Sequence, residues 1–206
     1  MNEHLQIIKT KDISKSLIDA FIVETSDYLD IKFGFDYFFE SIDQPSFIQL
    51  IGDVIKWLPL EASAAAFFSR FAIRAADDIW DNKDKILSKM KDATFIPFNR
   101  FIQSIWRLKQ SSGEKTNISI GLSIPDIESG TTLHFKGNSE EEIIWYTGNF
   151  LINVQKISKV TEKETKKGNR ILGGFFLKLE QDGSFIIEWK TTDNKNNFNS
   201  FKVKIS

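Results

Sequence analysis

Three neighbouring carboxylates are the clearest candidates for chemistry in this chain of 206 residues. Asp77, Asp78 and Asp81 stand in the segment Asp77-Asp78-Ile79-Trp80-Asp81, which Asn82 follows. If the segment is helical, Asp77 and Asp81 lie one turn apart on a single face. Paired carboxylates suit a hard cation such as Mg²⁺. The spacing is compatible with a metal site. Whether a metal site is expected depends on the residues around the three carboxylates.

The acidic segment resembles the aspartate-rich motif of the polyprenyl diphosphate synthases, over six residues. The resemblance implies helix-borne carboxylates that hold Mg²⁺ against a diphosphate. That family has a second aspartate-rich segment on a facing helix, whereas the downstream chain here has a β pattern. Arg70 and Arg74 are expected on the same helical face, where Arg74 can pair with Asp77 or Asp78, and Lys85 can pair with Asp81. We therefore predict a solvated ion-pair face without a metal ligand, and a Mg-dependent diphosphate enzyme using Asp77, Asp78 and Asp81 stays a remote alternative.

Other catalytic chemistry finds little support in the residue types. The chain has no Cys, and its two histidines, His4 and His134, are far apart in the sequence. A histidine-dependent triad or a site with several His ligands cannot be built from this pair. Gly173-Gly174 precedes a strand pattern rather than a helix, so it is no phosphate loop. We predict no catalytic residue, no metal ligand, no cofactor and no small-molecule substrate, hence a protein that is not an enzyme.

The composition is that of an ordinary globular protein, with 41% hydrophobic and 27% charged residues. Its 19 Phe residues are concentrated in the first half. Residues 1–12 lack a signal-peptide core, and the apolar stretch 58–76 is interrupted by charges, so we expect a soluble, cytoplasmic protein.

Charge is distributed unevenly along the chain. Residues 1–81 hold 7 Lys and Arg against 14 Asp and Glu, whereas residues 83–115 hold 8 against 3. The basic strip contains aromatic residues, but these mostly share an inward helical stripe and the pI is near 6.2. Nucleic acid is thus an unlikely partner.

Apolar spacing changes from helical to alternating near residue 115. Before that point we expect helices over about 13–29, from Pro45 to Leu58, over 61–91 and over 97–110, with a packed connector at 30–44. The helix at 61–91 is expected to be central, because its apolar residues follow a continuous seam: Ala65, Phe68, Ala72, Ala75, Ile79, Asn82 and Ile86.

After residue 115 the pattern predicts a small sheet. Strands are expected at 118–124, around Leu133 and Phe135, and at 201–205. Ser139 and the acids after it predict a helix start for 139–161, although Gly148 and Asn149 leave a β-hairpin open as the alternative. The best hairpin signal surrounds Gln181-Asp182-Gly183. A three-residue loop with left-handed Gly183 pairs apolar residues on one face: Leu179 with Phe185, Leu177 with Ile187, and Phe175 with Trp189.

These elements predict an α+β protein with an N-terminal helical bundle. A small, mostly antiparallel sheet with one packed helix is expected to follow. We place a helical region at 1–112 and a sheet-plus-helix unit at 114–206, with the boundary at Ser111-Ser112-Gly113.

The function hypothesis that fits best is a non-catalytic protein-interaction protein, either an accessory subunit or an inhibitor- or immunity-type binder of another protein. Its support is the surplus of aromatic residues and the acidic first segment, which suit docking by apolar anchors within a charged rim. The alternative is a peripheral membrane protein that uses the Phe- and Ala-rich residues 45–76, with Trp57 near a helix end.

Overall fold

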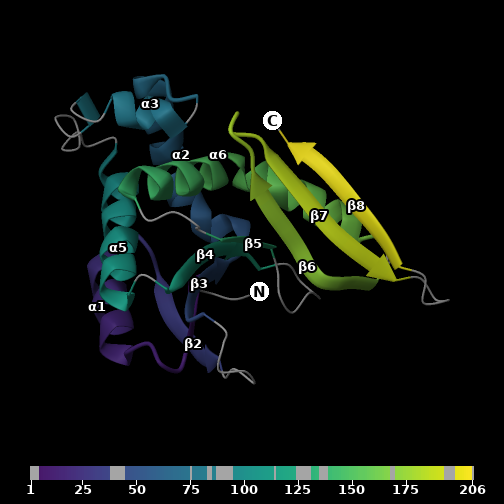
Figure 1. Ribbon diagram of the computed structural model, residues 1–206, viewed down its shortest axis with the longest axis horizontal. Coiled ribbons are helices and arrows are strands. Elements are labelled where there is room, and N and C mark those ends of the chain that lie inside the picture. Colours follow the sequence, from purple (N-terminus) through teal and green to yellow (C-terminus); the bar gives the residue numbers. More distant parts are fainter. Residues whose placement is uncertain are drawn as a thin grey trace.

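The computed structural model (Figure 1) describes most of the chain. The described residues are 5–37, 45–74, 76–82, 85–86, 95–113, 115–123, 131–134, 139–167, 170–192 and 198–205.

Within these residues the strands form one eight-stranded sheet in the order β2-β1-β3-β4-β5-β6-β7-β8. The pairs β1–β2, β3–β4 and β5–β6 are parallel, and the other neighbours are antiparallel. The strand bounds are β1 Leu5–Thr10, β2 Ile31–Tyr37, β3 Phe47–Gly52, β4 Asn117–Leu122, β5 Thr131–His134, β6 Arg170–Leu179, β7 Phe185–Thr192 and β8 Phe198–Ile205.

The helices pack against the sheet and against each other. Their bounds are α1 Lys15–Thr25, α2 Val54–Phe71, α3 Ala76–Asp81, α5 Ile96–Ser112 and α6 Glu140–Thr165. Helix α6 contacts β6, α2, α3 and α5, and it passes behind the strands in the view of Figure 1. Helix α1 lies beside α5.

The α+β class is confirmed, but the predicted N-terminal helical bundle is wrong. Strand β1 begins the described chain, and β1, β2 and β3 all lie before residue 112 in the same sheet as the later strands. The residues at 47–52 that suggested a helix after Pro45 include Ile48 and Leu50, which are fully buried on β3. Branched apolar residues buried between paired strands favour the extended chain.

Helix α2 begins after Asp53 and continues through Pro59. The Asp53 carboxylate accepts a hydrogen bond from Lys56 N at 3.2 Å, which caps the first turn. Pro59 lacks an N–H for the Ile55 carbonyl, so one helical hydrogen bond is lost. Burial of Trp57 and Leu60 around the proline offsets that loss. The expected helix end before Pro59 is therefore wrong.

The expected single helix over 61–91 is also interrupted. Ala72 adopts a left-handed conformation with φ of 51°, and Ile73 N donates to Phe68 O at 3.0 Å. This arrangement is a Schellman-type helix end, normally made with Gly. The chain restarts as the short α3, and residues 87–91 of the expected helix lie outside the described residues.

The elements after residue 113 agree better with the sequence. Strand β4 and helix α6 form where expected, and α6 resolves the choice at 139–161 in favour of a helix. Ser139 accepts a hydrogen bond from Glu142 N at 3.2 Å, as its capping position predicts. The β6–β7 pairs are those expected from the three-residue loop, and Gly183 has a φ of 79°.

The division into 1–112 and 114–206 stays a prediction. Strands β3 and β4, from opposite sides of Gly113, pair directly in the sheet, with Ile48 opposite Ile118 and Leu50 opposite Ile120.

Gly148 is a point of tight packing between α6 and α2. A Cβ atom at this position would lie 2.2 Å from Phe68 Cε2. We expect Gly148→Ala to destabilise the fold by about 1–3 kcal/mol through overpacking, despite a gain in helix propensity of about 0.8–1 kcal/mol. Urea unfolding measures the change, and Phe68→Leu combined with Gly148→Ala should recover part of it. A stabilised single variant would contradict the close packing.

Candidate interaction surface

The outward side of α2 is an uncharged, mostly apolar surface, which we name the α2 outer face. At about 100° per residue its members fall within roughly 120° of the helix. They are Ile55, Leu58, Pro59, Ala62, Ala65, Ala66 and Ser69. Ile55 is 60% exposed and Leu58 is 39% exposed, and the small residues Ala62 and Ala65 are exposed as well.

The opposite side of α2 explains why this face points outward. Trp57 is fully buried, its Nε1 donates to Gly121 O of β4 at 3.1 Å, and its ring contacts Phe101 of α5 and Phe150 of α6. Phe67 is buried two to three turns later on the same side. The core therefore fixes the rotation of α2 about its own axis.

Charged residues border the α2 outer face on both sides. Lys56 and Arg70 fall on one border, and Glu61 falls on the other at helical spacing. Glu61 accepts hydrogen bonds from Gln155 Nε2 of α6 at 3.0 and 2.9 Å, one to each carboxylate oxygen. The face is thus an apolar strip between a basic border and an acidic border.

Dimensions limit what the α2 outer face can bind alone. The helix has 18 residues and is therefore about 27 Å long. A strip about 10 Å wide offers a few hundred Å², less than the roughly 800 Å² per partner of a standard interface. We expect either a modest affinity or an interface that extends over both charged borders.

The acidic segment 77–81 forms the short helix α3, separate from α2. Asp78 accepts a hydrogen bond from the backbone N–H of Arg74 at 2.6 Å, and its carbonyl oxygen accepts one from Asn82 Nδ2 at 2.7 Å. Asp78 thus serves the start of its own helix. Because α2 ends at Phe71, the expected common helical face of Arg70 and the acids does not exist. No group of three or more His, Asp or Glu residues that could hold a metal occurs among the described residues.

Two other residues singled out in the sequence, Trp80 and His134, belong to elements other than α2. Trp80 on α3 is 64% exposed. His134 ends β5 and pairs in register with Ser119 of β4, whereas His4 lies outside the described residues.

A shallow hollow at the start of α1 has a volume of about 410 Å³. It is lined by Asp12, Ile13, Ser14, Ser16, Leu17, Ser111 and Ser112. Two side-chain hydrogen bonds lower the pKa of Asp12 below its usual value. The larger effect comes from Ser46 Oγ and the smaller from Thr10. These hydrogen bonds connect the loop before α1 to the residues beside β3. The Asp12 carboxylate therefore has a structural role.

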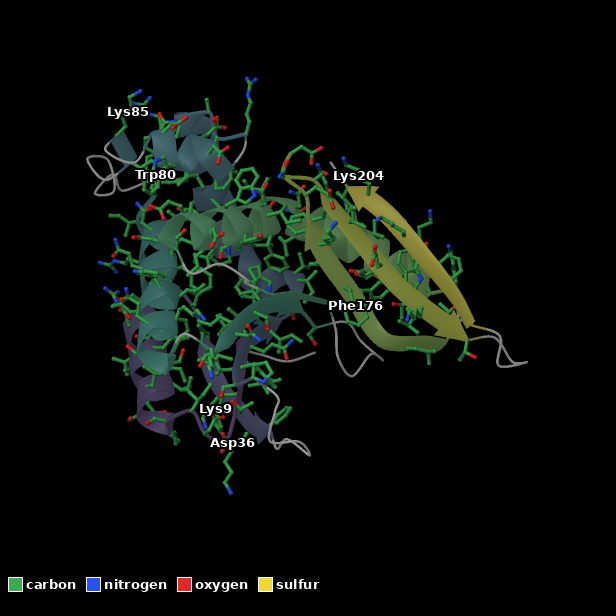
Figure 2. All side chains as sticks on the ribbon, viewed as in Figure 1. Lys9, Asp36, Trp80, Lys85, Phe176 and Lys204 are labelled. Carbon is green, nitrogen blue, oxygen red and sulfur yellow. The ribbon has the colours of Figure 1, made fainter. Side chains whose placement is uncertain are left out.

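Lys9 of β1 is a buried cation, with 3% of its side chain exposed. Its Nζ lies 2.5 Å from Asp36 Oδ1, and the two residues are register partners on β1 and β2. Figure 2 shows the two labelled residues beside each other at this end of the sheet. The buried charge is thus compensated by its cross-strand neighbour, which is a structural role.

No described helix combines the length and the apolar character needed to cross a membrane.

The lowered pKa of Asp12 predicts a defined pH effect. A carboxyl group whose pKa is lower when folded stabilises the fold above its unfolded pKa, and this stabilisation is lost as the pH falls through the folded pKa. Asp12→Asn should therefore lose less stability than the wild type between roughly pH 5 and pH 2. Thermal melts across this range measure it. Asp19→Asn, at an exposed acid paired with Lys15, controls for simple loss of charge. Parallel pH curves for the wild type and Asp12→Asn would exclude the effect.

Comparison of the chain with protein-family models, with curated proteins and with solved structures found no match.

Proposed function

We propose that this protein is a non-catalytic binder of another protein, in the manner of an accessory subunit or an inhibitor- or immunity-type protein. The observation that carries the proposal is the α2 outer face. Ile55 and Leu58 are large apolar side chains that remain exposed on a helix whose opposite side is buried in the core. Exposed apolar residues that gather on one face and have a charged rim are typical of protein docking sites.

The shape of the face favours a helix of the partner as its occupant. Ala62 and Ala65 leave a smooth central strip, so a second helix can approach closely, because interaxial distance depends on the side chains at the contact. Ile55 and Leu58 then supply the anchors at one end. A membrane surface fits less well, because Trp57, the aromatic anchor suggested by the sequence, is fully buried.

The borders specify the charge pattern of that partner. A complementary helix carries acidic residues beside Lys56 and Arg70, and a basic residue beside Glu61. A second copy of this chain fits poorly. In an antiparallel two-fold pair the same borders meet, so the basic border of one copy lies beside the basic border of the other, and the acidic borders likewise lie side by side.

The proposal includes the absence of catalysis, of a cofactor and of nucleic-acid binding, and a cytoplasmic location. Sequence chemistry supports these parts: the chain has no Cys for disulfides and only two His.

The test is whether charged residues placed on the α2 outer face weaken binding of the partner protein. Ile55→Glu with Leu58→Glu leaves the core intact, because both side chains are exposed. A partner captured stoichiometrically by the wild type is purified and its affinity is measured by calorimetry. We expect the double variant to bind at least about tenfold more weakly, because interface anchors each contribute more than about 1 kcal/mol.

The matched control is Val23→Glu on α1, where Val23 is 73% exposed and lies away from α2. This control should bind the partner as the wild type does. Equal loss in the control, or undiminished binding by the double variant, would refute the α2 outer face as the docking site. Flotation with vesicles of neutral or anionic phospholipid that requires Ile55 and Leu58 would instead establish the membrane alternative. Concentration-dependent dimerisation lost in the double variant would identify a second copy as the occupant.

A further inference from the structure

The last strand of the sheet ends in an open edge. Strand β8 pairs with β7 on one side, and within the described residues no strand pairs with its other side. It is eight residues long and stands as the outermost strand in Figure 1. An edge of this length presents a row of backbone donors and acceptors that another strand can use.

The turn between β6 and β7 shows which backbone groups point out from β8. Glu180 N donates to Ser184 O at 2.8 Å, so these two residues direct their backbone groups toward each other. The direction alternates along a strand, and Ile187, three residues after Ser184, therefore points toward β8. Its register partner Val203 points back toward β7.

By the same alternation, the N–H and C=O groups of Ser200, Lys202 and Lys204 point outward from the sheet. An antiparallel strand added at this edge would place its residues directly opposite these three positions. The side chains of Lys202 and Lys204 share one face of the sheet and are both more than half exposed.

Charge on this face selects the partner strand. Lys202 lies 3.4 Å from Glu188 and Lys204 lies 3.0 Å from Asp182, so each lysine has an acid on its inner side. An acidic residue on the outer side would continue this alternation of sign across the strands. A second copy of β8 would not: antiparallel registers centred on Lys202 or Val203 set lysine opposite lysine.

The other face of β8 is apolar and incomplete at the edge. Phe175, Trp189 and Phe201 are register partners on three successive strands, with ring centroids 5.5 and 5.4 Å apart. Phe175 and Trp189 are buried, whereas Phe201 is 43% exposed. An apolar side chain on an added strand would cover the open side of Phe201 and half-buried Val203.

We propose that the β8 edge binds an extended segment of a partner protein by strand addition, and that this segment alternates acidic with apolar residues. Its acids face Lys202 and Lys204, its apolar residues extend the row that ends at Phe201, and its backbone pairs with that of Ser200, Lys202 and Lys204. The lysines thus oppose a second copy in the registers centred on Lys202 or Val203, and they admit an acidic strand. This surface is separate from the α2 outer face and does not depend on the function proposed there.

The experiment compares two capped, fluorescent nonapeptides in which Val alternates with Glu or with Lys. Fluorescence anisotropy at low salt should show binding of the Glu peptide about fivefold or more tighter than the Lys peptide, because cross-strand ion pairs contribute additively at two positions. Added salt should weaken the binding of the Glu peptide, because salt screens the ion pairs. Binding should also slow hydrogen exchange of the amides of Ser200, Lys202 and Lys204.

Two sets of variants separate backbone pairing from simple attraction. Ser200→Pro removes an outward N–H and keeps both lysines. This variant should bind the Glu peptide about fivefold more weakly. Lys202→Glu with Lys204→Glu should reverse the peptide preference, and the corresponding Gln variant should abolish it. Lys178→Glu with Lys190→Glu changes charge equally on the inner strands β6 and β7 and should retain the preference.

Equal binding of both peptides overturns the proposal. Unchanged binding in Ser200→Pro also overturns it, because attraction without strand pairing explains that result. If the wild type alone self-associates in sedimentation equilibrium and Ser200→Pro prevents this, the occupant is a second copy and the acidic-strand proposal fails.

Discussion

The buried Trp57 side chain is the interaction on which the arrangement of the molecule depends. It stands on α2, donates a hydrogen bond to Gly121 O of β4, and makes edge contacts with Phe101 of α5 and Phe150 of α6, at 6.0 and 5.6 Å between ring centroids. One side chain thus connects three helices and the centre of the sheet. Edge contacts of this kind stabilise a core beyond simple area burial, and the indole N–H is satisfied without water. Because a buried N–H without an acceptor costs about 1–3 kcal/mol, the hydrogen bond also specifies how α2 sits on β4.

Both exposed surfaces follow from that arrangement. With Trp57 directed inward, the side of α2 that carries Ile55 and Leu58 stays partly exposed, with Ile55 at 60% and Leu58 at 39%. The sheet places β3 beside β4 under α2 and then extends through β5, β6 and β7 to β8, where strand pairing stops. The helix that covers the later strands, α6, packs on their apolar face and leaves the outer backbone of β8 open.

The sequence is sufficient to predict those elements whose determining contacts are local. The register of β6 and β7 follows from the apolar alternation around Gly183, and the start of α6 follows from Ser139 and its acids. The sequence is insufficient where residues distant in the chain decide the conformation of a segment. Ile48 and Leu50 fit a helix or a strand equally well until Ile118 and Ile120 pair with them. The end of α2 at Ala72 carries neither Gly nor Pro, so no local signal marked it. The candidate surface could be predicted only in part for the same reason. The sequence marks residues 45–76 as a membrane-contact alternative, but which side of α2 faces out depends on where Trp57 is buried.

The two proposed docking surfaces would differ in the kind of selectivity that they provide. Apolar burial on the α2 outer face has no preferred direction, so its selectivity must come from Lys56, Arg70 and Glu61 at the borders. Strand addition at β8 is directional, because each outward N–H and C=O requires a partner at a fixed spacing and a shift of one residue exchanges the two faces. An added strand in the wrong register would place its acids against Phe201 and its apolar residues against Lys202 and Lys204. In the proposed complex, register and charge would reinforce each other at β8, and this coupling would let the eight-residue edge discriminate between otherwise similar extended segments.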